Sequence, residues 1–153
     1  MRLLFLLAIL LLPVLGQGQP VARLRPFLHD SRYGYLDSAG AVRLAPRFRA
    51  AGEFAEGLAP VREQGLYGFI DGSGAWVLPA RYDYATSFRQ GYALVWVAGR
   101  PQLITRQGRN VLPAGLQQVE YMPGEGRPDY LRVRTAAGRQ GLAGVGIQVA
   151  LRN

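Results

Sequence analysis

Short apolar segments, separated by turn-forming residues, follow one another along most of the chain. Residues 67–70 and 75–78 are examples: each is rich in aromatic and aliphatic side chains, and Asp71, Gly72, Ser73 and Gly74 lie between them. Short segments of this composition, bounded by such residues, are typical of β-strands. No window has the spacing of apolar residues that predicts an amphipathic helix. We therefore expect an all-β fold.

The pattern repeats with a period of 34 residues. Asp37 and Asp71 are separated by this step, and Gly40, Gly74 and Gly108 keep it twice. Self-similarity at such a period indicates a repeat architecture, in which one supersecondary unit is copied and stacked.

Four units fit the chain, at about residues 24–45, 58–79, 92–113 and 131–151. We expect each to be a three-stranded antiparallel sheet. The fourth is out of step, because Gly138 aligns with Gly99 at a spacing of 39 residues. The extra length lies in Met122–Asp129, a turn-rich stretch where insertions cost little. We expect an open, curved array. The alternative is propeller-like closure, in which blades usually have four strands and the connectors could contribute the fourth.

The turn inside each unit places Asp first and Gly last. Asp37 precedes Gly40 and Asp71 precedes Gly74, while Gly108 keeps only the glycine. An Asp side chain bonds to the backbone two residues on, and Gly accepts the positive φ that closes such a turn. A calcium loop needs several oxygen ligands at alternating positions, but each turn offers one carboxylate. We interpret these residues as structural and expect no metal.

Aromatic residues recur at fixed places in the unit. Tyr33 and Tyr35 point to one face of a strand, so Gly34 leaves a gap on the other face where a ring can approach the backbone. The connectors between units also carry aromatic residues in phase, which we expect to pack onto the core. These residues are Phe48 with Tyr82, and Phe54 with Phe88.

The second unit carries a specific order of motifs: residues 67–79, then Arg81-Tyr82-Asp83, then residues 88–95. This order resembles the WG repeat, which has an aromatic-Gly-(Tyr/Phe)-Ile-Asp turn, a Gly, an apolar strand, a Pro, a basic-Tyr-Asp step and Phe-x-x-Gly-Leu-Ala-x-Val. Tyr replaces the signature Trp in the first two units, and the resemblance is strong only over about residues 24–113. It implies a β-rich repeat scaffold, found largely in bacteria, with no common enzymatic activity and mostly undefined partners.

The N-terminus has a different composition from the repeats. Leu3–Leu15 is almost wholly apolar, follows Arg2, and precedes the small residues Gly16 and Gly18. This arrangement is typical of a secretory signal peptide. The run is shorter than the roughly 20 residues of a membrane span. We expect residues 1–18 to be a cleaved signal peptide and residues 19–153 to be the repeat domain, exported to the periplasm, cell envelope or medium. An uncleaved N-terminal anchor is the alternative.

The chain is basic and has no cysteine. All 18 basic residues are arginine, and Asp and Glu total 10, for a net charge of +8. Arginine suits carboxylates, sulfates and phosphates, and it also stacks on rings. Arg47 and Arg81 are in phase, each just before an aromatic residue; with Arg43 and Arg89 they are the candidate anion-binding residues. The alternative is a solvated basic surface that keeps strand edges from pairing with other chains.

The sequence contains little that could carry a reaction. The single histidine, His29, lies in a short loop with Asp30 as the only nearby acid. An enzyme needs a nucleophile or an acid–base pair in a perturbed environment, and no set of zinc ligands or phosphate loop is present. We expect no enzymatic activity, no cofactor and no metal. A degenerate hydrolase would require Asp, Glu and His29 to gather in one pocket.

These observations favour non-catalytic binding or scaffolding in the cell envelope. Repeat arrays expose extended surfaces that bind partners, and a protein partner is the first expectation. Capture of an anionic envelope glycan or lipid head group by the arginines is the alternative, which a steep dependence on salt would reveal. We expect no nucleic acid partner, and no stable membrane span after signal cleavage. Residues that break the repeat are the most informative about function.

Overall fold

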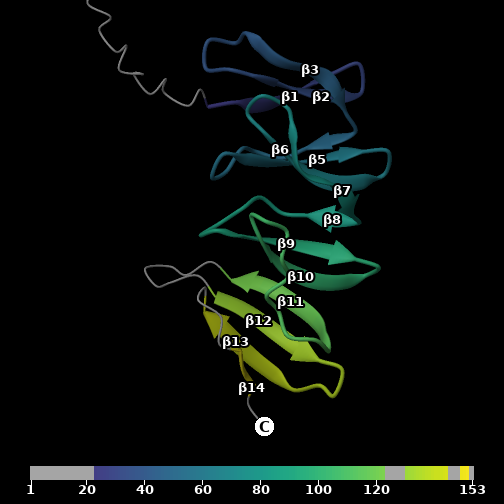
Figure 1. The fold of residues 1–153 in the computed structure, drawn as a ribbon, viewed down its shortest axis with the longest axis vertical. Helices are drawn as coiled ribbons and strands as arrows, with labels where there is room; N and C mark the ends of the chain where they lie inside the picture. Colours follow the sequence, from purple (N-terminus) through teal and green to yellow (C-terminus); the bar gives the residue numbers. More distant parts are fainter. Residues whose placement is uncertain (1–22, 123–129, 145–148, 152–153) are drawn as a thin grey trace, which may run out of the picture.

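The computed structural model describes residues 23–122, 130–144 and 149–151, and within these ranges it contains strands and turns but no helix. The strands form four antiparallel sheets, stacked in chain order along the long axis of the molecule (Figure 1). The first and last sheets lie at opposite ends, and none of the four is closed into a barrel. The expected all-β fold is confirmed, and the stack has the form of an open array. No helix long and apolar enough to cross a membrane occurs in the described ranges. Residues 1–18 lie outside them.

The connectors between units contribute strands of their own. The first sheet contains the expected three strands, whereas the second begins with β4, which pairs antiparallel with β5; β8 pairs with β9 in the same way. A single residue separates β3 from β4 and β7 from β8, so one run of chain completes a sheet and starts the next. In chain order the strands are β1 (Arg25–His29), β2 (Arg32–Leu36), β3 (Val42–Phe48), β4 (Ala50–Ala51), β5 (Leu58–Glu63), β6 (Leu66–Asp71), β7 (Trp76–Tyr82), β8 (Tyr84–Ala85), β9 (Tyr92–Val97) and β10 (Arg100–Thr105).

The second sheet therefore has four strands, and the third and fourth sheets are built from other segments than expected. The third has the order β10-β9-β8, because the residues expected to form its last strand make only a single bridge, between Ile104 and Asn110. The fourth begins with β11 (Leu116–Met122), in the segment expected to be a connector. It continues with β12 (Tyr130–Thr135), β13 (Gln140–Gly144) and β14 (Val149–Leu151).

The sequence alignment of the fourth unit was wrong at Gly138. The N–H of Thr135 donates to the carbonyl of Arg139 (2.9 Å), and the N–H of Gly138 donates to the carbonyl of Thr135 (3.0 Å). The same two bonds close the turn that ends in Gly108. Gly138 is therefore the counterpart of Gly108, and not of Gly99, which lies in the two-residue turn between β9 and β10. Both kinds of turn need a glycine with positive φ, so glycine spacing alone could not distinguish them.

The Asp–Gly turns form as expected. Asp37 Oδ1 accepts hydrogen bonds from the N–H groups of Ala39 (2.9 Å) and Ala41 (3.0 Å), and Gly40 has a φ of +81°. The turn one unit later repeats this geometry. The carboxylate thus holds the turn, and its hydrogen-bonded oxygen faces the backbone of the protein itself.

The glycine of each aromatic-Gly pair is needed because a neighbouring strand lies against it. The pairing of β7 with β6 shifts opposite Gly68, and a Cβ there would lie 2.6 Å from the carbonyl oxygen of Leu78 and 2.7 Å from the ring of Trp76. Gly34 has the same relation to β3 and to the ring of Phe27. The predicted approach of a ring to the glycine is confirmed. The backbone of the bulged strand lies equally close, which makes the need for glycine at this position stricter.

Among the described residues, three hydrophobic clusters fill the spaces between consecutive sheets. The in-phase connector aromatics belong to them: Phe48, Tyr82 and Phe88 are buried, and Phe54 is half-buried. Phe88 meets the ring of Phe69 edge-on at 4.8 Å between centroids. The prediction that these residues pack onto the core is confirmed.

Candidate functional site

Two of the four predicted anion-binding arginines connect neighbouring sheets. The Arg47 guanidinium lies 4.7 Å from the centre of the Phe48 ring and donates a hydrogen bond to the carbonyl oxygen of Gly74, in the next sheet (3.0 Å). Arg81 makes the same contacts one unit later, 5.2 Å from the adjacent tyrosine ring and 3.4 Å from the carbonyl oxygen of Gly108. Each of these arginines therefore has a structural role, which sequence reasoning missed.

Arg43 is paired with the aspartate of the first turn. Its Nε donates to Asp37 Oδ2 at 2.8 Å, and Asp37 is only 7% exposed. The pKa of Asp37 is lowered, chiefly by the hydrogen bond from the N–H of Ala41 and also by the bonds from Arg43 and Ala39, which together outweigh the opposing effect of desolvation. Arg43 thus helps to keep this turn carboxylate ionised.

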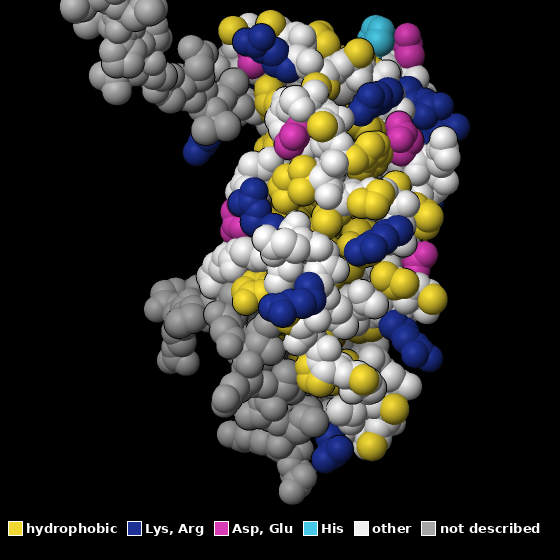
Figure 2. All heavy atoms as spheres, viewed as in Figure 1, with side chains coloured by type: hydrophobic (Ala, Val, Ile, Leu, Met, Phe, Trp, Pro, Cys, Tyr) yellow, Lys and Arg dark blue, Asp and Glu magenta, His cyan; other side chains and the backbone are white. Residues whose placement is uncertain are grey.

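Arg89, the fourth predicted residue, lies apart from the other three. It precedes β9 and lies exposed at the edge of a groove, and the other three contact turns of the first three sheets. On the face shown in Figure 2, arginine side chains are found at several heights of the column, with other side chains between most of them. The structure therefore does not gather the four predicted arginines into one site.

The strongest candidate for a binding site is the groove beside Arg89, here called the inter-sheet groove. Its volume is about 420 Å³, and residues of the second, third and fourth sheets line it. The buried side chains of Leu94, Leu103 and Leu131 form an apolar floor, whereas Tyr84 is 52% exposed at the rim. The lining residues are Gly52, Pro60, Tyr84, Ala85, Thr86, Ser87, Arg89, Tyr92, Leu94, Leu103 and Leu131.

The rim of this groove is formed where the repeat is broken. Tyr84 occupies the position held by Ala50 one unit earlier, and its partner on β9, Trp96, occupies that of Arg62. The Tyr84 ring meets Trp96 edge-on at 5.4 Å and Tyr67 at 5.6 Å. Such pairs contribute about 0.5–1.5 kcal/mol each beyond the area that they bury. These substitutions within the repeat were a signal, readable in the sequence, that could have located the groove.

Hydroxyl groups fix the wall of the groove. Thr86 Oγ1 accepts a hydrogen bond from the N–H of Leu94 (3.0 Å) and donates to its carbonyl (3.2 Å), while Ser87 Oγ donates to the carbonyl of Glu53 (3.1 Å). These bonds hold the connector against β9 and against the preceding unit. The wall is therefore preorganised, and these hydroxyls are already used in holding it.

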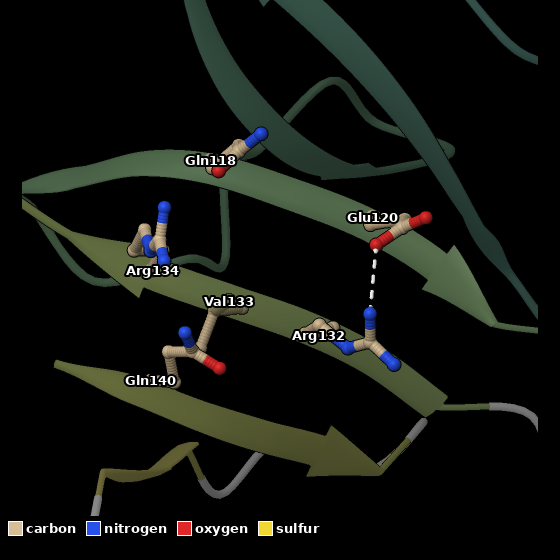
Figure 3. A pocket seen from close by; sticks show the side chains of 6 residues that line it. All are labelled: Gln118, Glu120, Arg132, Val133, Arg134 and Gln140. Carbon is tan, nitrogen blue, oxygen red and sulfur yellow. Dashed lines mark hydrogen bonds and ion pairs between the residues drawn. The ribbon is translucent and has the colours of Figure 1, made fainter. Parts of the chain in front are cut away.

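The outer face of the last sheet carries a second, polar hollow of about 250 Å³ (Figure 3). Glu120 and Arg132 form an ion pair across it, with 3.4 Å between Oε2 and Nη1. Apolar side chains of the same strands, Leu131 and Val133, are buried in the cluster shared with the third sheet. Gln118, Arg134 and Gln140 complete the hollow. A polar outer face on the terminal unit is what keeps a stacked array soluble.

The residues that a hydrolase would need are not gathered by the described structure. His29 lies at the turn between β1 and β2, with its Nε2 3.3 Å from Asp30 Oδ2, and the two side chains are 68% and 90% exposed. No group of three or more His, Cys, Asp and Glu residues that could hold a metal occurs within the described ranges.

The repeat also appears in comparison with known protein families. No curated protein matches the chain. The family described as "WG containing repeat" matches residues 33–67 and 67–96. Each match runs from the strand that carries the aromatic-Gly pair, β2 or β6, into the next sheet. Residues 33–96 of this chain thus carry two WG containing repeats, and the protein is a β-repeat protein.

Proposed function

We propose that this chain is a non-enzymatic binding protein that holds a protein partner in the inter-sheet groove. The groove itself carries this proposal: it combines a buried leucine floor with an exposed tyrosine and an arginine at the rim. Tyrosine and arginine are enriched at the centres of protein interfaces, where they surround or fill desolvated pockets. The groove also lies where the repeat is broken, since Tyr84 takes the place of Ala50 in the preceding unit.

Binding explains this lining better than catalysis does. The groove lining contains hydroxyl, phenol and guanidinium groups, but among its residues there is no carboxylate or imidazole that would activate them. Thr86 and Ser87 are engaged with the backbone. The volume, about 420 Å³, falls within the range of roughly 300–1,000 Å³ in which clefts accept ligands or side chains.

The segment that fits is extended, with apolar side chains for the leucine floor and an acidic residue beside Arg89. The apolar part follows from the floor and the tyrosine rim. The acidic part follows from charge, because the whole chain carries a net charge of +8 and the rim contributes an arginine. We further propose that this binding takes place after export, on the basis of the signal-like residues 1–18.

The arginine-mediated capture of an anionic glycan or lipid head group stays the alternative. In the folded chain Arg43, Arg47 and Arg81 already bond to a carboxylate or to carbonyl groups. An anionic polymer would have to compete with these bonds. Retention on dextran sulfate that persists at physiological salt and then falls steeply as salt rises would favour this alternative.

Selection of phage-displayed random linear peptides on the purified protein tests the groove. We expect enriched peptides to combine apolar and acidic residues. Tyr84→Ser should weaken their binding by about tenfold or more, because truncating an interface tyrosine costs roughly 2 kcal/mol. Arg89→Glu should weaken it as well.

Matched variants outside the groove separate a local effect from a general one. Val77→Ser removes an apolar side chain that is 42% exposed on β7, and Arg139→Glu reverses an exposed charge in the last sheet. Both should bind the selected peptides as the wild type does. Peptides that bind Tyr84→Ser as tightly as the wild type would overturn the groove as the binding site.

A further inference from the structure

The second and third sheets are each completed at one edge by a strand from outside the unit. On β5, the carbonyl groups of Arg62 and Pro60 accept hydrogen bonds from the N–H groups of Arg49 and Gly52, both at 2.8 Å, on either side of β4. On β9, β8 occupies the same edge. Addition of a short antiparallel strand to this edge is therefore part of how the array is built.

The same edge of β1 has no strand on it among the described residues. The order of the first sheet is β1-β2-β3, so β1 lies at its border. Phe27 of β1 pairs with Gly34 of β2, just as Val61 of β5 pairs with Gly68 of β6. The backbone groups of β1 therefore point to the same sides as those of β5. The carbonyl groups of Pro26 and Leu28 consequently point outward, as those of their counterparts on β5 do.

Proline at position 26 fits this orientation. In an antiparallel strand the N–H and the carbonyl of one residue point to the same side. Proline is tolerated at an edge when its nitrogen faces away from the sheet. Leu28, two residues further along the same border, has an outward N–H and is 59% exposed. The edge therefore offers two acceptors and one donor to an incoming strand.

The outer face of the first sheet keeps apolar side chains at positions that are covered in the second sheet. Val42 is 57% exposed, and Leu36 is only half-buried. One unit later, the counterparts of Phe27 and Leu36, which are Val61 and Ile70, are fully buried against the first sheet. The last sheet presents the polar side chains of Figure 3 on its outer face, together with Leu142, which lies opposite Arg132 and is 54% exposed. The first sheet thus keeps part of the apolar face of an internal unit.

We propose that β1 accepts an extended, acidic segment of a partner protein as an added antiparallel strand. Such strand addition gives affinity through main-chain hydrogen bonds and specificity through alternate side chains. Apolar residues of the segment would lie beside Phe27, on the outer face of β1. Acidic residues would lie beside the exposed Arg25 and close to Arg23, on a border where the one described carboxylate, Asp30, contacts His29.

Charge argues for an acidic partner over a second copy of this chain. A pair of antiparallel β1 strands would bring the exposed Arg25 of both copies to one shared border, whereas an acidic segment would bring carboxylates to it. Edge strands that carry basic residues commonly resist pairing with themselves for this reason.

The test measures binding of a synthetic peptide of alternating valine and glutamate to the full chain, by fluorescence anisotropy. Leu28→Pro removes the outward N–H without touching the bonds to β2, whereas Leu28→Ala keeps that N–H. We expect Leu28→Pro to bind at least tenfold more weakly than Leu28→Ala at equal thermal stability. The peptide should also slow hydrogen exchange of the Leu28 amide.

Four results would overturn the proposal. One is equal binding by the two Leu28 variants, and another is equal binding of a valine–lysine peptide, which would remove the role of charge. The third is protection of the Leu28 amide in the free monomer, which would mean that the chain's own N-terminal segment covers the edge. The fourth is a dimer that Leu28→Pro dissociates, which would identify a second copy. Tyr84→Ser should bind the valine–glutamate peptide normally, so failure here and failure of the groove are distinguishable.

Discussion

Replacing Gly68 by alanine tests whether the backbone of β7 is what requires glycine in the aromatic-Gly pair. A Cβ at this position would lie 2.6 Å from the carbonyl oxygen of Leu78 and 2.7 Å from the backbone nitrogen of Ala80. These are backbone atoms of a strand paired to β6, so they cannot move aside as the end of a flexible side chain can. The bulge in β7 would have to shift.

Two opposing effects set the size of the change. Alanine inside an element is more stable than glycine by about 0.5–1 kcal/mol, because the unfolded glycine chain has more freedom to lose. Forcing an extra methyl group into a packed site costs about 1–3 kcal/mol. Because both close contacts are with backbone atoms, the overpacking cost should lie in the upper half of its range, and we expect Gly68→Ala to lower the free energy of unfolding by about 1–2.5 kcal/mol.

Gly72→Ala is the matched control, since it makes the same chemical change in an open place. Gly72 lies outside the positive-φ region, and the nearest atom to its Cβ position is a methyl group of Leu24 at 4.0 Å. This variant should gain about 0.4–1 kcal/mol. Urea denaturation followed by both circular dichroism and tryptophan fluorescence measures the two changes, because a repeat array can unfold in parts. A Gly68→Ala protein as stable as the wild type would refute the reasoning, and so would an equal loss in Gly72→Ala.

Three further predictions concern the turns and the contacts between sheets. Arg47→Met should keep the stem on the Phe48 ring but lose the bond to the next sheet, lowering the free energy of unfolding by about 0.5–1.5 kcal/mol in urea titrations; no loss relative to the exposed Arg106→Met would contradict this. Ala98 lies in the two-residue turn after β9 with a φ of +49°, which asparagine tolerates better than alanine. Ala98→Asn should therefore raise the free energy of unfolding by up to about 1 kcal/mol, seen as a higher melting temperature. A lower melting temperature would count against strain at this turn. The lowered pKa of Asp37 means that its ionised form stabilises the fold above the unfolded pKa of about 3.9, and that this stability is lost as pH falls through the folded value. Asp37→Asn should therefore be less stable at neutral pH and show a shallower decline of melting temperature in acid, and an unchanged decline would exclude this role.

Local features of the fold could be read from the sequence, because they depend on residues close together in the chain. The Asp37 turn forms through its own backbone groups, and Gly40 supplies the positive φ that it needs. The recurrence of Phe88 in phase with Phe54 predicted its place in the core, since a repeated aromatic residue packs in the same way in each copy. The period itself predicted stacked units.

The candidate site was harder to predict, because its residues come from distant parts of the chain. Of the residues that line the inter-sheet groove, Arg89 alone had been singled out as a site residue, for its charge. Leu131 and Gly52 meet at the groove only because the second, third and fourth sheets are stacked. The replacement of Ala50 by Tyr84 in the next unit marks one position of the groove, but it does not indicate which residues from other sheets line the groove with it.

The sequence by itself determined the repeating unit, its turns and its all-β character, since these follow from local backbone preferences and from the period of apolar residues. The tertiary structure alone decided which strands share a sheet. It made strands of the connectors as β4 and β8, removed the last strand of the third sheet, and aligned Gly138 with Gly108. It also turned Arg47 from a candidate ligand into a contact between sheets. Strand partners depend on which hydrogen-bonding edges meet when units stack, and spacing along the chain does not specify that meeting.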